Sequence, residues 1–572
     1  MSTTAATGAV TEPDAALVAG RSEAGAPRQR RRESLATLTA YTVLSILLFG
    51  LPVLGHFSSR IIAADAIDSS AFLWFFAWWP HAIFHGLNPF VTHVMFVPDG
   101  FNLTWGTSMP GPSLLMTPVT ELFGPAATWN VIQLASPALS AWTAYLLCRH
   151  VTGRLWPSLV GGYVYGFSPY MLVHLTGGPY LALVPLLPVL VLLVLKRTEG
   201  SIGPRRFVVA TAAALTGQFL ISSEVLLTAT LFGGISLVLA FALLPERRRP
   251  LLDVGKLLIL AYAATAVLIS PFLYFFLFGH QYPPGATYFT ADVAGFALPP
   301  PLVALSRQHP AFAGANTETY LGLPLIVLIV GFMWQSRRSR VAWVIGLSLA
   351  AAALLSLGGY LWVRGHLTSF PLPWYLIGRL PLLRYAITLR FAVFVVLPAA
   401  LIVALWCSRD GTAPALRWGL AALAVLFIVP EVGSSSWKTN VQDPPFFASG
   451  AYRNYVKPAD HVLTVPAWGP NERWQANTGF RFKLADGYLG NPFPPSYSRY
   501  PAWNMLLNGQ LTPHYAADLK QFIAAKGVTA IVVDRTVPGP WTRLFATLGV
   551  RPVATGGVLF YRLKPTGARG AA

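Results

Sequence analysis

The uncharged run at residues 225–244, VLLTATLFGGISLVLAFALL, decides the fold class. At about 1.5 Å of rise per residue, a helix of this length spans the roughly 30 Å hydrocarbon core of a bilayer. Comparable runs recur along the 572 residues, of which 54% are hydrophobic and only 11% are charged. Soluble domains carry about 25% charged residues. The sequence therefore predicts a polytopic α-helical membrane protein.

Basic residues fall in short clusters between the apolar runs, including Arg247–Arg249 directly after the run quoted above. Cytoplasmic loops of membrane proteins are enriched in Lys and Arg, so this clustering reports topology and accounts for the net charge of +19 without nucleic acid as a partner. About 11 spans, with the N-terminus inside and the C-terminus outside, place every cluster inside. The expected spans are approximately 36–56, 125–147, 156–173, 179–195, 207–223, 225–244, 254–278, 319–335, 341–362, 387–407 and 416–433.

This topology divides the chain into three parts. Residues 1–33 are rich in Ala, Gly, Ser and Arg, and we expect a disordered cytoplasmic tail. Residues 34–433 form the transmembrane part, whose long outer loops are 57–124, 279–318 and 363–386. Residues 434–572 carry more charge and short-period elements, which indicate a small extracytoplasmic α/β domain. Its predicted elements are strands at 462–466 and 529–534, a helix at 516–526, and a closing hairpin from 551–555 and 558–563.

Two acids stand in the first outer loop, directly before an aromatic run. Asp65 and Asp68 precede Ser69–Ala77 and then Trp78-Trp79-Pro80-His81. Asp favours helix N-termini, so one interpretation is that both acids cap the run. The other is that a carboxylate at the membrane boundary acts as a general base or holds a divalent cation. In that case the neighbouring aromatic residues are candidates for stacking on sugar faces, and the alternative is an ordinary aromatic belt at the membrane interface.

Cations on the predicted outer side run against the inside bias. The stretch Arg384-Tyr385-Ala386-Ile387-Thr388-Leu389-Arg390 carries two arginines at the outer boundary, and Arg364, His366 and Arg379 lie in the loop before it. Such residues bind an anionic headgroup or phosphate, or they snorkel to the lipid headgroups. The sequence alone leaves both interpretations open.

Two further acids are candidates for a site. Glu224 lies where two predicted spans turn at the outer face, and an acid at membrane depth points to function by default. The alternative is that Glu224 has no role in a site, because a tight turn would expose its side chain to water. Asp292 has the same standing in the second long outer loop.

Four stretches resemble a known group of enzymes: Asp68–Trp79, then Gly86-Leu87-Asn88-Pro89-Phe90, Asn102–Ser108 and Gly166-Phe167-Ser168-Pro169-Tyr170-Met171. Together with the order of spans, outer loops and soluble tail, they resemble the GT-C superfamily of polyprenyl-phosphate-sugar-dependent membrane glycosyltransferases, and in particular an actinobacterial group. The motif-level resemblance covers about 110 residues.

The resemblance implies an inverting transfer of sugar from a polyprenyl-phosphate donor to an envelope glycan or lipid, in which a first-loop acid deprotonates the acceptor. Asp68 occupies the matching position, with Asp65 second, because Asp-x-x-Asp replaces the usual adjacent acidic pair. The donor phosphate is expected at Arg384 and Arg390, with Arg379 and His366 nearby. The acceptor is expected at Glu224, Asp292, Trp78, Trp79, His81 and Asn102.

Other classes of membrane protein remain as alternatives. A transporter or lipid flippase predicts acids and arginines deep within spans, and these are nearly absent. A non-catalytic envelope scaffold is disfavoured only by the acid-bearing first loop. The sequence has no Gly-rich phosphate loop with Lys and Ser or Thr, so the chain is not itself expected to be an ATPase. Whether a divalent cation is needed is left open.

Overall fold

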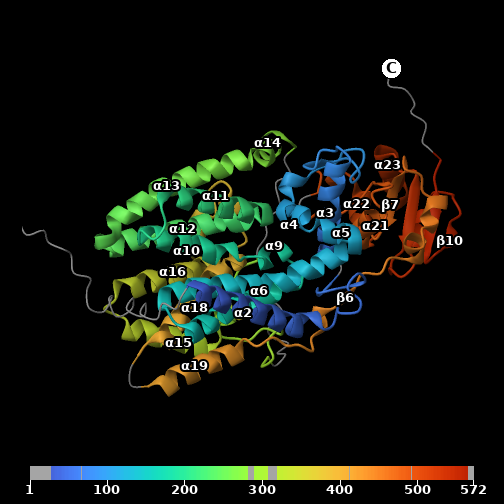
Figure 1. Cartoon of the computed structure of the whole chain (residues 1–572). Coiled ribbons are helices and arrows are strands. Elements are labelled where there is room, and N and C mark those ends of the chain that lie inside the picture. Colours follow the sequence, from blue (N-terminus) through green and yellow to red (C-terminus); the bar gives the residue numbers. More distant parts are fainter. Residues whose placement is uncertain are drawn as a thin grey trace, which may run out of the picture. The chain divides into compact units, whose positions relative to one another are not determined.

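The computed structural model describes residues 27–65, 67–280, 289–306, 318–410, 413–490 and 493–564. Most of the predicted N-terminal tail and parts of the predicted loop 279–318 lie outside these ranges. The chain forms two compact units (Figure 1). Unit 1 comprises Met1–Leu51, Ile132–Leu268 and Ala286–Ser434, and unit 2 comprises Pro52–Val131, Ile269–Gly285 and Ser435–Ala572.

Unit 1 is mostly helical. Among the described residues of the chain, six helical segments are long and apolar enough to cross a membrane: Arg28–Gly50, Pro125–Thr152, Pro179–Thr198, Ser223–Leu243, Pro245–Leu268 and Thr388–Ser408. They contain α2 (Pro27–Ser45), α6 (Pro125–Thr152), α9 (Pro179–Ala182), α10 (Leu186–Thr198), α12 (Ser223–Leu243), α13 (Arg248–Leu268) and α18 (Ala392–Ser408). The other helices are α7 (Leu155–Gly166), α8 (Pro169–Leu175), α11 (Pro204–Ile221), α15 (Leu323–Gln335), α16 (Arg340–Ser356), α17 (Trp374–Ile377) and α19 (Pro414–Phe427).

Several predicted boundaries were wrong for local reasons. Helix α2 begins at Pro27, so its first turns include residues expected to be disordered. The run predicted at 156–173 divides into α7 and α8, because Ser168 caps α8 and accepts a hydrogen bond from the Met171 N–H. The run 341–362 ends early, since Gly358 adopts a left-handed φ of 79° after α16. Strands β4 (Tyr360–Val363) and β5 (His366–Pro371) then form a hairpin.

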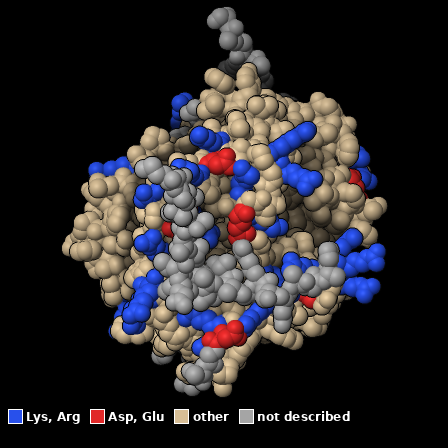
Figure 2. Space-filling model, turned by 60° about the vertical axis from the view of Figure 1, so that its left-hand side comes forward, with Lys and Arg blue, Asp and Glu red and all other residues tan. Residues whose placement is uncertain are grey.

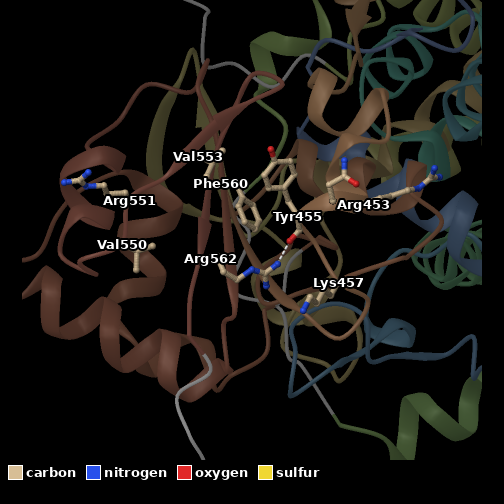
Figure 3. Close-up of a pocket in the computed structure, with 9 residues that line it drawn as sticks. Arg453, Tyr455, Lys457, Val550, Arg551, Val553, Phe560 and Arg562 are labelled. Carbon is tan, nitrogen blue, oxygen red and sulfur yellow. Dashed lines mark hydrogen bonds between the residues drawn. The ribbon is translucent and has the colours of Figure 1, made fainter.

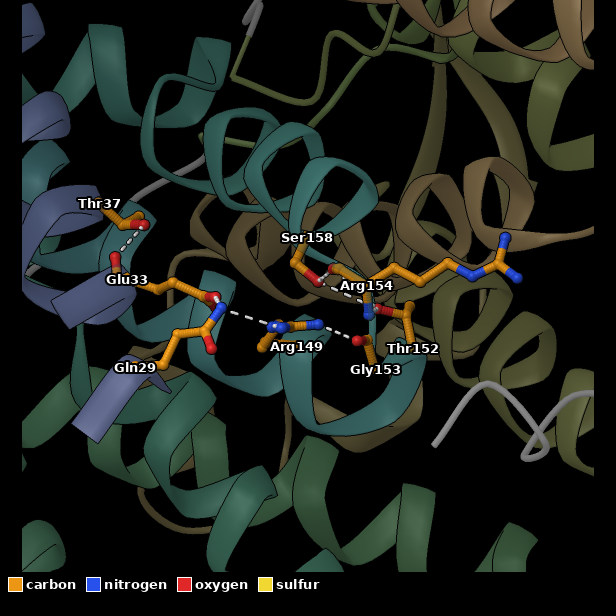
Figure 4. Close-up of polar contacts among 8 residues, drawn as sticks. All are labelled: Gln29, Glu33, Thr37, Arg149, Thr152, Gly153, Arg154 and Ser158. Carbon is orange, nitrogen blue, oxygen red and sulfur yellow. Dashed lines mark hydrogen bonds and ion pairs between the residues drawn. The ribbon is translucent and has the colours of Figure 1, made fainter. Parts of the chain in front are cut away.

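The basic clusters meet at one end of unit 1. Arg149 at the end of α6 pairs with Glu33 of α2 at 3.2 Å, and its guanidinium also donates to the Gly153 carbonyl (Figure 4). Further ion pairs join the same helix ends: His150–Glu199, Arg154–Asp410 and Arg197–Asp253. Figure 2 shows Lys and Arg spread over one face with few acidic side chains among them. A shared end is what the predicted alternation of spans requires.

Unit 2 contains a five-stranded sheet of order β10-β11-β9-β7-β8. Strand β7 (His461–Val465) runs parallel to β8 (Lys483–Leu484) and β9 (Ala530–Asp534), whereas β11 (Val558–Arg562) is antiparallel to β9 and β10 (Val553–Thr555). The α-helices of this part are α20 (Pro445–Ala448), α21 (Pro470–Asn477), α22 (Pro501–Asn508), α23 (Tyr515–Lys526) and α24 (Trp541–Ala546). Each predicted strand and helix of the tail is present, with ends shifted by at most two residues.

The first predicted outer loop belongs to the same unit as this sheet. It forms α3 (Ile67–Phe84), α4 (Pro110–Leu115) and α5 (Thr117–Phe123), and α3 packs against α21. Gln475 of α21 joins the two segments: its Oε1 accepts from Trp74 Nε1 at 2.7 Å, and its Nε2 donates to the carbonyls of Val94 and Phe482. Helix α14 (Ser270–Phe278), predicted as the end of the span 254–278, also lies in unit 2. The short pairs β1 (Arg60–Ile61) with β6 (Thr439–Asn440) and β2 (Val91–Thr92) with β3 (Phe101–Asn102) lie in unit 2 as well.

Candidate active site

The two first-loop acids have different partners at the N-terminus of α3. Asp65 Oδ1 accepts a hydrogen bond from the Ile67 backbone N–H at 2.8 Å, which is the capping contact considered for both acids. Asp68 lies in the first turn of the helix, and its exposed carboxylate accepts a hydrogen bond from the Tyr488 hydroxyl group at 2.9 Å. Only Asp68 is thus tied to the C-terminal part of unit 2 by its carboxylate.

Tyr488 is held by a buried carboxyl group. Its backbone N–H donates to Glu472 Oε1, and its ring lies edge-on to the Trp468 ring at 5.7 Å. Two residues before it, Asp486 Oδ2 accepts from both the N–H and the hydroxyl group of Thr464, at 2.9 and 2.6 Å. Glu472 and Asp486 therefore position the segment from which Tyr488 reaches Asp68.

Glu472 and Asp486 are both fully buried and act on each other. Burial raises the pKa of Asp486 to about 8, although the hydrogen bonds from Thr464 act to lower it. Burial raises the pKa of Glu472 well above its ordinary value, and the nearby charge of Asp486 raises it further. Two carboxyl groups in such a site cannot both ionise cheaply, so the pair retains protons at neutral pH. No sequence signal identified either residue, because their burial is set by the packing of unit 2.

The aromatic residues expected to contact sugar lie inside unit 2. Trp78 and Trp79 are buried, and Trp78 Nε1 donates to the Pro89 carbonyl at 3.1 Å. His81 is half-buried and stacks on His85, with ring centroids 4.1 Å apart. Burial, assisted by His85, lowers the pKa of His81 to about 4, so this imidazole is neutral at physiological pH. Packing accounts for both tryptophans in this structure.

Asn102 is a structural residue rather than an exposed acceptor contact. Its side-chain oxygen accepts from the N–H and hydroxyl group of Thr104, and its amide nitrogen donates to the carbonyls of Phe275 and His280. These four bonds use the whole hydrogen-bonding capacity of the amide. Because the side chain is also buried, the expected substrate contact does not fit this arrangement.

Unit 1 brings together two residues that the sequence assigned to different substrates. Arg390, expected at the donor phosphate, forms an ion pair with Glu224, expected at the acceptor. The guanidinium of Arg390 also lies over the Tyr180 ring, 5.5 Å from its centroid. A guanidinium already matched by a carboxylate is a weaker phosphate ligand than an unmatched one, so the ion pair competes with the expected role.

A second charged pair lies in unit 1. His174 Nε2 and Glu318 Oε2 are 3.3 Å apart, both side chains are largely buried, and Tyr170 packs edge-on against His174 at 4.4 Å. The charges of Glu224, Glu318 and Arg390 all act on Tyr170. No local sequence pattern connects His174 with Glu318, because the two residues are distant in the chain.

The other predicted phosphate ligands are exposed. His366 lies on β5, Arg379 rests over the Tyr375 ring at 4.3 Å, and Arg384 rests over the Tyr385 ring at 4.6 Å. Asp292 is buried instead: its Oδ1 accepts from the Ala294 N–H at 2.7 Å and its Oδ2 from the Gly365 N–H at 2.6 Å. Asp292 thus supports the β4–β5 turn.

A candidate metal site requires several converging ligands. Within the described ranges, no group of three or more His, Cys, Asp or Glu side chains is arranged to hold a metal ion. Asp65 and Asp68, the pair considered for a divalent cation, direct carboxylate oxygens to different hydrogen-bond donors.

Comparisons with known proteins give structural matches only. No protein-family model matches the sequence, and no curated protein matches it. The arabinofuranosyltransferase AftD from Mycobacteria has a TM-score of 0.57 at 13% identity over 95% of this chain, which spans 40% of that enzyme's length. The oligosaccharyltransferase AglB from Archaeoglobus fulgidus, in complex with an inhibitory peptide and a dolichol-phosphate, has a TM-score of 0.54 at 10% identity, covering 94% of this chain and 74% of that one. A further structure of the Archaeoglobus fulgidus oligosaccharyltransferase, in complex with Zn and sulfate, has a TM-score of 0.53 at 12% identity, covering 92% of this chain and 73% of that one.

At these identities the similarity concerns the fold. Both the arabinofuranosyltransferase and the oligosaccharyltransferase match nearly the whole of this chain, including its apolar helices and its C-terminal part. The fold of the chain is therefore similar to the folds of the arabinofuranosyltransferase and the oligosaccharyltransferase.

Proposed function

We propose that the chain is an inverting glycosyltransferase that moves a sugar from a polyprenyl-phosphate donor to an extracytoplasmic glycan or lipid of the cell envelope. The observation that carries the proposal is the exposed Asp68 carboxylate at the start of α3, oriented by the Tyr488 hydroxyl group. A positioned carboxylate at the protein surface is suited to take a proton from an incoming hydroxyl group. The GT-C architecture is compatible with this chemistry.

In the proposed reaction, Asp68 removes the proton of the acceptor hydroxyl group while its oxygen bonds to the anomeric carbon of the donor sugar. The bond between that carbon and the phosphate oxygen breaks, and its electron pair leaves with the polyprenyl phosphate. Attack from the face opposite the leaving group inverts the configuration. Asp65 is the second choice for the base, because its carboxylate already caps the α3 N-terminus.

An apolar cavity in unit 1 supports a lipid-linked donor. It has a volume of about 500 Å³ and is lined mainly by aliphatic side chains of α10, α11, α12, α13, α16 and α18. Gly233 and Gly234 of α12 line it, and a side chain at either position would enter open space. A cavity of this size and lining suits a segment of isoprenoid chain.

The exposed cations of unit 1 suit the donor phosphate better than Arg390 does. Arg379 and Arg384 stack on tyrosine rings, and the described residues contribute no carboxylate that pairs with either. Arg390 would have to give up its ion pair with Glu224 before binding a phosphate. We therefore assign the phosphate first to Arg379 and Arg384, and His366 on β5 is a further candidate ligand.

The test is a transfer assay with purified protein, a panel of polyprenyl-phosphate sugars and an envelope-lipid extract. Loss of a general base lowers turnover by about 10²–10⁴-fold, so Asp68→Asn should lose activity on that scale. Asp65→Asn is the matched control and should retain most activity. Repeating the assay with a chelator addresses the requirement for a divalent cation. Full activity in Asp68→Asn would refute the assignment of the base.

A second arm examines the lipid. Gly234→Leu fills the cavity, whereas Gly255→Leu adds the same side chain to open space on α13 outside it. We expect Gly234→Leu alone to weaken binding of the polyprenyl phosphate. If the wild-type protein neither binds any polyprenyl phosphate nor turns over any donor, the transferase proposal fails in favour of a transporter or a scaffold.

A further inference from the structure

The C-terminal part of unit 2 contains a cavity of about 420 Å³ that takes no part in the proposed chemistry at Asp68. It lies between the segment 453–457 and the β10–β11 hairpin (Figure 3). Four of its lining residues are cationic, and none is acidic. The lining comprises Arg453, Asn454, Tyr455, Lys457, Val550, Arg551, Val553, Phe560 and Arg562.

The structure fixes one of these cations in place. Arg562 Nη1 donates to Asp460 Oδ1 at 2.8 Å, its Nη2 donates to the Tyr455 carbonyl, and its guanidinium lies 5.3 Å from the centroid of the Phe560 ring. Burial tends to raise the pKa of Asp460, but hydrogen bonds from the Lys457 N–H, Arg562 and Thr529 outweigh it and lower the pKa. Asp460 therefore stays ionised and balances the charge of Arg562.

The other three cations have no such balance. Arg453, Lys457 and Arg551 are exposed, and within the described ranges no carboxylate forms an ion pair with them. Figure 3 shows Lys457 near Arg562, with Arg453 and Arg551 at opposite ends and their guanidinium groups directed outward. Lys457 and the two arginines at the margin of the cavity are unmatched positive charges, and together they create a positive potential that attracts anions. Val553 and Phe560 add an apolar surface.

We propose that this cavity binds a phosphate ester on a sugar unit of the acceptor. Lys and Arg form strong charge-assisted hydrogen bonds to phosphate oxygens, and the volume lies in the range of small-molecule sites. The apolar wall suits contact with the C–H face of a sugar ring. A bare phosphate ion would make no such contact with this wall. The inference rests on the proposed glycosyl transfer for the identity of the ligand as acceptor, but binding itself is independent of catalysis.

The experiment uses the full chain in phosphatidylcholine nanodiscs and measures calorimetric binding of mannose 6-phosphate, mannose and inorganic phosphate. The pocket variant is Lys457→Gln with Arg551→Gln. The control is Lys520→Gln with Arg499→Gln, which removes the same charge from exposed positions outside the cavity. We expect mannose 6-phosphate to bind more tightly than either other probe. The pocket variant should weaken its binding on the order of tenfold or more, and the control should not.

If both variants weaken the binding of mannose 6-phosphate equally, the binding comes from diffuse surface charge and the proposal is overturned. Tighter binding of mannose than of mannose 6-phosphate would also overturn it. A second arm titrates vesicles of phosphatidylglycerol. If the pocket variant loses vesicle binding while sugar phosphate fails to bind the wild type, a lipid headgroup is the source of the phosphate and the acceptor assignment is wrong. Asp68→Asn should bind mannose 6-phosphate normally, so failure of the transferase proposal and failure of this site are distinguishable.

Discussion

The Tyr488 hydroxyl group donates a hydrogen bond to Asp68 Oδ1 over 2.9 Å, although 420 positions separate the two residues in the chain. The same tyrosine is anchored through its backbone N–H to the buried Glu472. The C-terminal part of the chain thus holds a carboxylate of the first predicted outer loop in place. The sequence predicted a separate C-terminal domain at 434–572, but its residues orient the proposed base and lie in the same unit as the first outer loop.

Tyr488→Phe should lower kcat about tenfold while leaving KM and thermal stability nearly unchanged. The variant removes one hydroxyl group and keeps the ring against Trp468, so only the orientation of Asp68 is released. Steady-state transfer kinetics provide the measurement. Tyr515→Phe, on α23 away from Asp68, is the matched control. An unchanged kcat in Tyr488→Phe would show that Asp68 needs no such support.

The buried acids predict a pH dependence of stability. Asp486 has an ordinary pKa of 3.8 and a folded-state pKa of about 8, so the folded state binds more protons than the unfolded state between these values. The contribution of Asp486 to stability is therefore greatest at low pH and declines as pH rises through this window. Asp486→Asn should flatten that decline, as followed by thermal unfolding from pH 5 to 8. Asp518→Asn on α23 should preserve it, and equal slopes in all three proteins would contradict the assignment.

The Glu224–Arg390 ion pair predicts coupled effects on stability. Their side chains are 25% and 24% exposed, so water screens the pair only in part. Glu224→Gln and Arg390→Gln should each lower the unfolding temperature, because each leaves a partly buried charge without its partner. The double variant should lose less than the sum, with a coupling energy of about 0.5–3 kcal/mol. Strict additivity in detergent-solubilised protein would mean that the two side chains do not act as a pair.

Gln475→Leu should destabilise unit 2 by about 3 kcal/mol or more. The substitution removes three hydrogen bonds of the buried Gln475 side chain and leaves Trp74 Nε1 and the carbonyls of Val94 and Phe482 without that partner. Limited proteolysis should show faster cleavage of the first-loop segment and the tail together. Arg481→Leu, an exposed position after α21, serves as the control. Faster cleavage of the tail alone would mean that the two segments unfold independently.

Local chemistry made much of the secondary structure predictable. Alternating and continuous apolar runs located the tail strands β7 and β9 to within one residue, because a buried strand needs only its own side-chain pattern. Helix ends were less predictable. The break between α7 and α8 depends on the Ser168 cap, and the end of α16 depends on a left-handed glycine. Neither feature changes the hydropathy of the sequence, from which the membrane spans were predicted.

By itself, the sequence determined the helical membrane class and the basic clusters that share one end of unit 1. It also determined the position of Asp68 before an aromatic helix. Charge and hydropathy are properties of short segments, so all three can be read without the tertiary structure. Only the tertiary structure decided which partner each acid has. Asp65 caps its own helix, Asp68 meets Tyr488, and Glu224 meets Arg390. The Asp65 cap is local, but the other two pairings join residues that are distant in the chain, 420 positions apart in unit 2 and 166 positions apart in unit 1. A short-range sequence pattern carries no information about such contacts.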